Sequence, residues 1–273
     1  MGSKIFMAMP VLLLMLVLAY PVADAMLKKE ETPYDTEIVQ VTTNSDKSIC
    51  RWGLCRGEDG NIPEAGKAEV DILMSGGGMY LGDINENRMY LTFDEGYENG
   101  FTEKILDTLR DKNVKAIFFI TGDYFEKNTH IIRRMIEEGH YVGNHSMNHY
   151  SMPELSYEKC EAEILELDRL FFDKFGKHMV FFRPPKGEYN EQVLEIVNNL
   201  KYKSIMWSFA YKDWITDEQK GKAYAFDMIT KNFHNGAILL LHAVSKDNAD
   251  ALSEVIDKAR NMGYEFGNPE ELI

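Results

Sequence analysis

The amino-acid sequence predicts an α/β fold whose parallel strands close, or nearly close, into a barrel. From Ile62 to the C-terminus, short apolar segments typical of buried strands alternate with longer segments of helical periodicity. Strands joined by helical crossovers pair in parallel, and about seven such units favour a barrel over an open sheet. Polar residues also recur directly after strand ends, where the active sites of parallel barrels lie.

Each predicted strand is an apolar or aromatic run, and each predicted helix carries an apolar stripe. The predicted strands are 88–93, 116–120, 141–143, 179–182, 204–207, 237–242 and 264–266. The predicted helices are 102–112, 129–138, 156–175, 190–199, 221–233 and 249–262. Thr102 is the expected N-cap of its helix, and Gly139 and Gly176 are expected to end theirs.

The first 25 residues predict a cleavable signal peptide. Lys4 provides a short positive region, residues 5–18 are almost wholly apolar, and Ala23-Asp24-Ala25 offers small residues to a signal peptidase. The apolar run is shorter than the ~20 residues of a membrane-spanning helix. An uncleaved N-terminal anchor is the alternative. We therefore expect an exported protein, secreted or in the cell envelope, with no stable membrane span after cleavage.

The rest of the 273-residue chain divides into a polar lead-in, residues 26–61, and one domain, residues 62–273, with enough apolar residues for a single core. The net charge of −14 argues against nucleic acid or an anionic membrane as a partner. Nothing in the sequence requires more than a monomer. Cys50 and Cys55 are close enough in sequence for a small disulfide loop, whereas Cys160 is expected to be a buried apolar residue.

Two adjacent carboxylates, Asp94 and Glu95, follow the strand at 88–93. Such a pair can divide the work of hydrolysis, because one carboxylate can coordinate a metal while the other takes a proton from water. A pair of acids that caps a helix or sits in a loop is the alternative for this fragment taken alone.

Two histidines, His145 and His149, follow the strand at 141–143 with a spacing of four. On one helical turn both imidazoles would face the same way. Together with one carboxylate they would form a two-histidine, one-carboxylate metal site that leaves a position for water. Surface or core histidines are the alternative for an isolated pair.

Three later strand ends carry further candidates, Arg183, Asp213 and His242. Arg183 precedes two prolines that fix the backbone, so its guanidinium could orient a carboxylate. Asp213 lies in an aromatic stretch and could orient a histidine. His242 ends a buried strand and, paired with a carboxylate, would suit a general acid. A surface salt bridge for Arg183 and simple core packing for the aromatic stretch are the alternatives.

Taken in order, these segments resemble the polysaccharide deacetylases of the NodB-homology family, carbohydrate esterase family 4. The segments that carry the resemblance are 91–96, 143–149, 182–187, 207–214 and 238–245, and it extends over about residues 62–273. The resemblance implies a distorted barrel of seven or eight β/α units. It also implies a divalent metal, with zinc as the expected ion, that activates water for attack on an N-acetyl carbonyl.

A narrower resemblance is to the muramic acid de-N-acetylase branch of that family, which acts on peptidoglycan on the route to muramic δ-lactam in spore cortex. The segments that carry it are 63–67, 93–100, 183–187, 210–214 and 242–249. It implies a peptidoglycan glycan strand as the partner.

Carried over by position, the family's catalytic roles fall on Asp94 as the base, Arg183 as its support, His242 as the acid and Asp213 as the orienting group. The metal ligands fall on His145, His149 and Glu95. The substrate contacts fall on Lys186, whose backbone N–H would face the oxyanion, and on Tyr211, Trp214 and Leu240. One departure concerns Glu95, because the broader family has aspartate there and the longer side chain displaces the carboxylate.

Two other functions compete with this prediction. The first is deacetylation of N-acetylglucosamine in peptidoglycan or in chitin-like oligomers, which pocket shape would separate. The second is glycan binding without catalysis, which predicts degraded catalytic positions. Asp94, Arg183 and His242 are all present, which argues against the second function.

Overall fold

The computed structural model describes residues 48–55 and 60–273. The predicted signal peptide, residues 1–25, and most of the predicted lead-in lie outside these residues. No helix among the described residues is both long enough and apolar enough to cross a membrane.

Seven strands form one sheet in which every pairing is parallel. The strand order is β10-β4-β5-β6-β7-β9, and β11 pairs with the beginning of β4. The strands are β4 (Arg88–Glu95), β5 (Ala116–Ile120), β6 (Tyr141–Asn144), β7 (Phe181–Phe182), β9 (Lys203–Ser204), β10 (Ile238–His242) and β11 (Glu265–Phe266). All seven fall on predicted strands, although β7 and β9 are shorter than expected.

The two edges of the sheet are joined by single bridges rather than by a full strand. The chain leaving β9 reaches Phe209, which bridges Leu239 of β10 at the opposite edge. Met79 bridges Ile205 in parallel on the way. The sheet is therefore curled into a distorted barrel, as the sequence predicts, and its closure is irregular.

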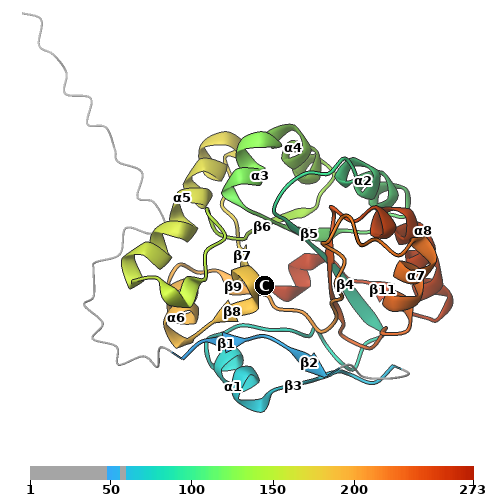
Figure 1. The fold of residues 1–273 in the computed structure, drawn as a ribbon, viewed down its shortest axis with the longest axis horizontal. Helices are drawn as coiled ribbons and strands as arrows, with labels where there is room; N and C mark the ends of the chain where they lie inside the picture. Colours follow the sequence, from blue (N-terminus) through green and yellow to red (C-terminus); the bar gives the residue numbers. More distant parts are fainter. Residues whose placement is uncertain (1–47, 56–59) are drawn as a thin grey trace, which may run out of the picture. The chain divides into compact units, whose positions relative to one another are not determined.

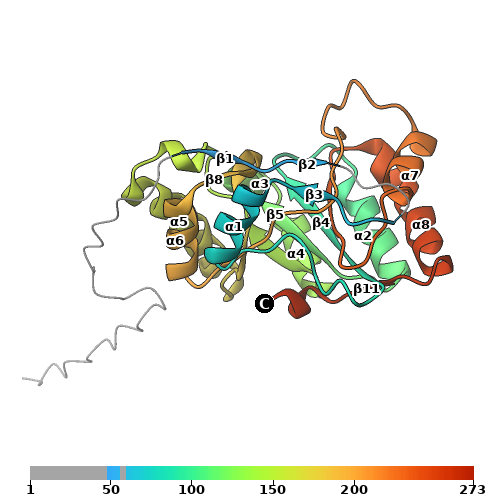
Figure 2. The same cartoon turned by 90° about the horizontal axis from the view of Figure 1, so that it is seen from below.

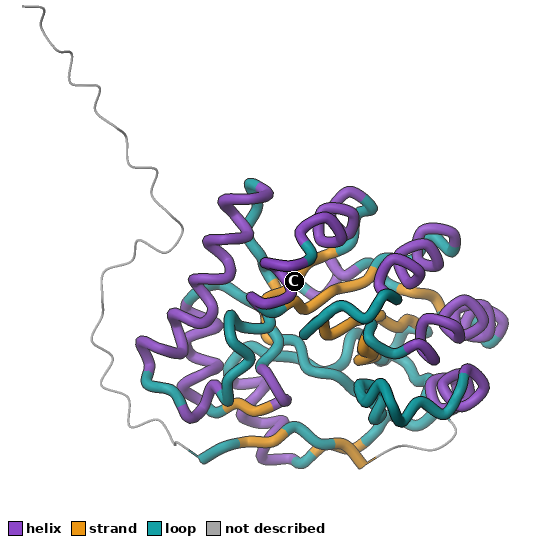
Figure 3. The backbone as a smooth tube through the Cα atoms, turned by 45° about the horizontal axis from the view of Figure 1, so that its top comes forward, coloured by secondary structure: helices purple, strands orange, loops and turns teal. Residues whose placement is uncertain are grey.

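Helices cover the outer face of the curled sheet, where Figure 3 shows them in an arc around the strands. They are α1 (Lys67–Ser75), α2 (Thr102–Asp111), α3 (Gly122–Lys127), α4 (Thr129–Glu137), α5 (Tyr157–Phe175), α6 (Glu191–Asn199), α7 (Lys222–Thr230) and α8 (Lys246–Asn261). Single 3₁₀ turns are η1 (Met152–Glu154), η2 (Pro185–Gly187) and η3 (Pro269–Leu272). The C-terminal turn η3 lies within the ring of elements in Figure 1.

The helix boundaries correct three sequence predictions. Thr102 is not an N-cap: Phe101 holds that position, and the Thr102 hydroxyl donates to Glu98 instead. Helix α8 begins three residues before the predicted start because the Ser245 side chain caps it. Helix α3 was not predicted, since its six residues are too few to show a periodic apolar stripe. The predicted helix ends are confirmed, with Gly139 and Gly176 both at positive φ.

Part of the predicted lead-in packs on the barrel, as Figure 2 shows from below. Strand β1 (Cys50–Arg51) pairs antiparallel with β8 (Glu188–Tyr189), and β2 (Leu54–Cys55) pairs with β3 (Glu64–Ala65). The buried Trp52 donates its indole N–H to the Trp207 carbonyl at 2.9 Å. These residues therefore support the segments that follow β7 and β9. Cys55 is an exposed free thiol, so the disulfide considered from the sequence is not formed.

The inside of the barrel changes from apolar to polar along the strands. An apolar cluster contains Leu272 of η3 and residues in or directly after the strands, namely Tyr90, Ile117, Phe119, Phe181, Ile205 and Ile238. A side chain two or four residues beyond one of these strand residues points to the same face of the sheet. Asp94, Arg183 and His242 have this parity, so the strand geometry directs all three into the carboxyl end of the barrel.

Candidate active site

A buried ion pair joins Asp94 and Arg183, two of the predicted site residues. Arg183 is fully buried, and its Nη1 donates to Asp94 Oδ1 at 2.7 Å. Its other nitrogens donate to the carbonyls of Ile205 and Met206, and its guanidinium lies 4.1 Å from the Phe119 ring centre. Burial raises the pKa of Asp94, but the charge and hydrogen bond of Arg183, together with His145 and His242, outweigh burial, so the pKa is lowered. Asp94 is therefore held as a carboxylate.

The two histidines come together on a loop and not on a helical turn, which corrects the sequence prediction. Ser146 and His149 both have positive φ, a conformation that an α-helix excludes. The loop is fixed by Glu163 of α5, whose carboxylate accepts from the Asn148 backbone and side chain, each at 2.7 Å. The imidazole centres of His145 and His149 are nevertheless 4.9 Å apart. The two imidazoles therefore lie close together as expected, but a loop and not a helix holds them.

His145 is held in a form that could bind a metal. Its Nδ1 lies 2.8 Å from the Arg183 carbonyl, and since a carbonyl only accepts, Nδ1 carries the proton. Its Nε2 then has a free lone pair and faces Asp94 Oδ2 at 3.6 Å. Burial lowers the pKa of His145 to about 4 and also lowers that of His149. Both imidazoles are thus neutral, the form that metals bind.

Glu95 does not join the histidine pair. Successive residues of a strand point to opposite faces, so Glu95 points away from the face that Asp94 occupies. It is fully buried, and neither of its carboxylate oxygens has a hydrogen-bond partner among the described residues. Burial, followed by the nearby Glu98 and Asp94 carboxylates, raises its pKa well above the usual value. The ligand role expected for Glu95 is therefore not supported by the geometry.

The donor set fits a divalent metal only in part. In residues 48–55 and 60–273, no three side chains of histidine, cysteine, aspartate or glutamate gather closely enough to hold an ion. His145 and His149 satisfy the chemical requirements for two ligands, with the second nitrogen of His145 anchored as metal sites require. A third protein ligand is not provided at Glu95.

Asp213 and His242 form the predicted carboxylate–imidazole pair. Asp213 Oδ1 lies 2.7 Å from His242 Nδ1, and its Oδ2 accepts from the His242 backbone N–H at 2.9 Å. Burial lowers the pKa of His242, but the charge and hydrogen bond of Asp213, together with the Asp94 charge, outweigh burial, so the pKa is raised. The partly buried imidazole thus holds its proton toward neutral pH, as a general acid requires.

The predicted substrate residues separate into exposed and buried ones. Trp214 is 48% exposed, and its ring centre lies 5.4 Å from that of His242, so it can offer an apolar face to a sugar. Lys186 is exposed at the rim, with φ of 60° in the strained left-handed region. Leu240 is buried on the inner face of β10. Tyr211 is buried and its hydroxyl bonds to Asn248, so its ring is not an open contact surface.

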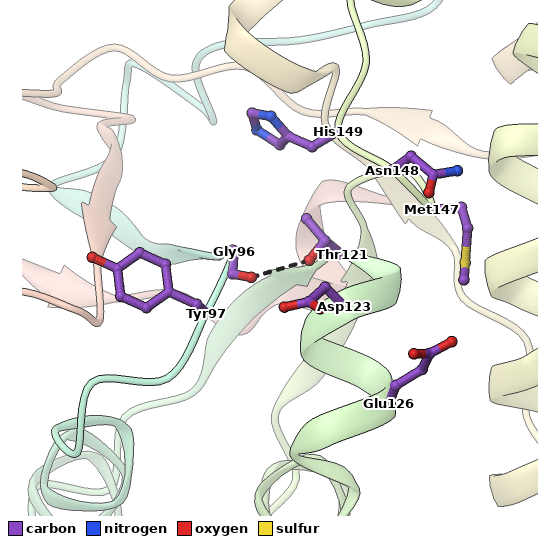
Figure 4. Close-up of a pocket in the computed structure, with 8 residues that line it drawn as sticks. All are labelled: Gly96, Tyr97, Thr121, Asp123, Glu126, Met147, Asn148 and His149. Carbon is purple, nitrogen blue, oxygen red and sulfur yellow. Dashed lines mark hydrogen bonds between the residues drawn. The ribbon is translucent and has the colours of Figure 1, made fainter.

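A cavity of about 430 Å³ adjoins His149. Figure 4 shows Tyr97 on one side of it, His149 and Asn148 on another, and Asp123 and Glu126 projecting from α3. Its other lining residues are Gly96, Thr121 and Met147. An aromatic ring beside carboxylates and an amide provides both the apolar face and the hydrogen bonds that a pyranose can use. Sequence reasoning predicted His149 but missed the other lining residues, because they come from the segment after β4, from α3 and its N-cap, and from the loop after β6.

A buried carboxylate, Asp94, and a carboxylate-paired histidine, His242, are register partners at the carboxyl end of a distorted parallel barrel, an arrangement that a hydrolase could use to activate water. The family model for polysaccharide deacetylase matches residues 82–205. The peptidoglycan-N-acetylmuramic acid deacetylase PdaA of Bacillus subtilis is 39% identical over 223 residues, which cover 81% of this chain and 85% of that protein. A peptidoglycan-N-acetylglucosamine deacetylase of Bacillus cereus is 32% identical over 194 residues, 69% of this chain and 89% of that protein.

The solved structure of Bacillus subtilis PdaA, a family 4 carbohydrate esterase, matches with a TM-score of 0.80 at 38% identity and covers 83% of this chain and 97% of that one. The chain therefore belongs to the polysaccharide deacetylases of carbohydrate esterase family 4, the NodB-homology family. It is a hydrolase that acts on carbon–nitrogen bonds other than peptide bonds.

Proposed function

We propose that this protein removes the acetyl group from N-acetylmuramic acid residues of peptidoglycan. The observation that carries the chemistry is the pairing of Asp94 with His242 across two adjacent strands. The choice of sugar rests on similarity, because PdaA has a higher identity to this chain than the N-acetylglucosamine deacetylase of Bacillus cereus and matches a larger share of this chain. A role in forming the muramic δ-lactam of spore cortex is part of this proposal.

The reaction follows from the positions of the side chains. The Asp94 carboxylate takes a proton from the attacking water as the water oxygen adds to the acetyl carbonyl carbon. The oxygen that becomes negative would be met by the Lys186 backbone N–H. When the carbon–nitrogen bond breaks, His242 gives its proton to the leaving amine, and acetate departs. Arg183 holds Asp94 and Asp213 holds His242 during these steps.

We further propose that His145 and His149 hold a divalent metal, and that zinc is the ion. Deacetylases of this family are generally metal-dependent. When bound, such an ion would lower the pKa of a water molecule and polarise the acetyl carbonyl. Two neutral imidazoles suit zinc, although they also suit several of its competitors.

The substrate contacts belong to the same proposal. The half-exposed Trp214 would lie against the sugar whose acetyl group is removed, and Leu240 would pack on the acetyl methyl. The cavity between Tyr97 and His149 would hold a neighbouring sugar of the strand. We also propose that the protein acts outside the cytoplasm as a monomer, on the basis of the signal-peptide pattern in residues 1–25 and the lack of any feature that demands association.

The test of the sugar assignment is the identity of the deacetylated unit. Purified peptidoglycan would be treated with the protein, digested to disaccharides and examined by mass spectrometry. The proposal predicts loss of one acetyl group from muramic acid only. Loss from glucosamine alone would keep the family and discard the proposed substrate.

A further inference from the structure

Asn248 contacts both residues of the Asp213–His242 pair. It lies in the first turn of α8 and is 1% exposed. Its Nδ2 donates to Asp213 Oδ2 at 2.6 Å and also lies 3.3 Å from the His242 carbonyl oxygen. A single buried amide therefore contacts both the carboxylate and the backbone of the proposed acid.

The orientation of this amide is determined by its neighbours. Carboxylate and carbonyl oxygens only accept hydrogen bonds, so the amide nitrogen must face Asp213 and His242. The amide oxygen then faces Tyr211, whose hydroxyl donates to it. Tyr211 is itself buried, so water does not compete for this bond. The four residues form one chain of hydrogen bonds that ends at the imidazole.

The backbone beneath Asn248 is also fixed. The Ser245 hydroxyl caps α8 by accepting from the Asn248 N–H at 3.2 Å, and it donates to Gln219 Oε1 at 2.6 Å. The amide consequently cannot retreat from Asp213 without breaking the start of the helix.

We propose that Asn248, itself held by Tyr211, is the positioning residue that fixes the rotation of the Asp213 carboxylate and thereby aims the His242 imidazole. With Oδ2 held by Asn248 and by the His242 N–H, Asp213 presents Oδ1 alone to Nδ1. The imidazole is then directed by a carboxylate that cannot turn. This inference rests on the proposed role of His242 as the acid, and Tyr211 becomes part of the support rather than a sugar contact.

The test compares Asn248→Ala with Asn190→Ala. Asn190 is also a buried asparagine at the start of a helix, where it accepts from the Val193 N–H, but it lies outside this chain of hydrogen bonds. Two quantities would be measured for each variant: kcat and KM for glycan deacetylation, and the downfield proton resonance of His242 Nδ1–H in the protein without substrate. Asn248→Ala is expected to lower kcat about ten- to a hundredfold with little change in KM, and to shift or broaden the resonance. Asn190→Ala is expected to leave both unchanged.

Two further variants sharpen the result. Asn248→Asp keeps the shape of the side chain but places a second carboxylate against Asp213, so it is expected to be at least as impaired as the alanine variant. Tyr211→Phe removes only the hydroxyl and is expected to lower kcat less than Asn248→Ala does. Tyr189→Phe loses a comparable buried bond, to the Glu69 carbonyl at 2.7 Å, and provides its control.

Equal kcat values and an unchanged His242 resonance in Asn248→Ala and Asn190→Ala would overturn the proposal. Because the resonance is read in the resting protein, this outcome is distinguishable from failure of the proposed substrate. A wild-type protein that deacetylates no glycan but loses the resonance on Asn248→Ala substitution would keep the positioning role and discard the substrate.

Discussion

Asp94 and His242 are register partners on the neighbouring parallel strands β4 and β10. Partners in a parallel pair lie on the same face of the sheet, about 5 Å apart along the hydrogen-bonding direction. The pairing therefore places a carboxylate and an imidazole side by side at the same depth of the barrel. Opposite shifts act on them, since the pKa of Asp94 is lowered and that of His242 is raised. The proposed base and the proposed acid are thus both shifted toward the protonation states that the reaction needs.

The first prediction concerns pH. Catalysis needs Asp94 deprotonated and His242 protonated, so kcat/KM should have a bell-shaped dependence on pH. The acid limb should lie below the ordinary pKa of an aspartate, and the alkaline limb should lie above the ordinary pKa of a histidine. His242 faces Asp213 and Asp94, which raise its pKa, and Arg183, which lowers it. Asp213→Asn should therefore move the alkaline limb to lower pH and leave the acid limb in place. An alkaline limb that does not move would contradict the assignment of His242 as the acid.

The second prediction concerns the buried ion pair. Arg183→Met should lower the free energy of unfolding by about 3–5 kcal/mol, because it leaves the Asp94 carboxylate buried without its partner. The lowered pKa of Asp94 means that the pair stabilises the fold above the unfolded pKa and loses that effect as pH falls through the folded one. Urea unfolding at pH 7 and at pH 3 should show a smaller difference between wild type and variant at the lower pH. The same substitution should move the acid limb of the kcat/KM profile to higher pH.

The third prediction concerns metal content. His145→Ala should lower bound divalent metal and activity together, since it removes one of two ligands. His130→Ala provides the control, because His130 is exposed on α4. Metal would be measured by mass spectrometry of the dialysed proteins. Full activity of a metal-free His145→Ala preparation would rule out the ligand role.

The fourth prediction separates Glu95 from the metal site. Glu95→Gln should leave metal content unchanged and kcat/KM within about threefold of wild type, because the carboxyl group points away from the histidines. A raised folded pKa for an acid costs stability as pH rises above its unfolded pKa, so the variant should be the more stable protein at pH 7. This advantage should shrink as pH falls toward the ordinary pKa of glutamate. Loss of metal in the variant would restore Glu95 as a ligand.

Much of the fold was predictable because its signals are local. The strand at 116–120 and the helix ends at Gly139 and Gly176 follow from apolar runs and from positions that need positive φ. The irregular way in which the barrel closes was not predictable, because it depends on single bridges such as Phe209 to Leu239 that no periodic pattern records. The start of α8 was missed because the apolar stripe begins after the Ser245 cap.

The site shows the same division. Asp94, Arg183, Asp213 and His242 were found because each follows a strand. The parity of β4 already implies that Asp94 and Glu95 face opposite sides, yet the carboxylates were read as one pair. Asn248 was overlooked because its role depends on the approach of α8 to Asp213, a contact between segments 35 residues apart.

The most direct test of the account is acetate release from peptidoglycan whose peptides an amidase has removed, compared between wild type and Asp94→Asn. The variant keeps an oxygen for Arg183 but loses the base, so its rate should fall about a hundred- to ten-thousandfold while glycan binding persists. Wild-type release that leaves deacetylated muramic acid, stops with a chelator and returns with added metal is the predicted result. Equal acetate release by the two proteins, or none by the wild type on any glycan, would contradict the account.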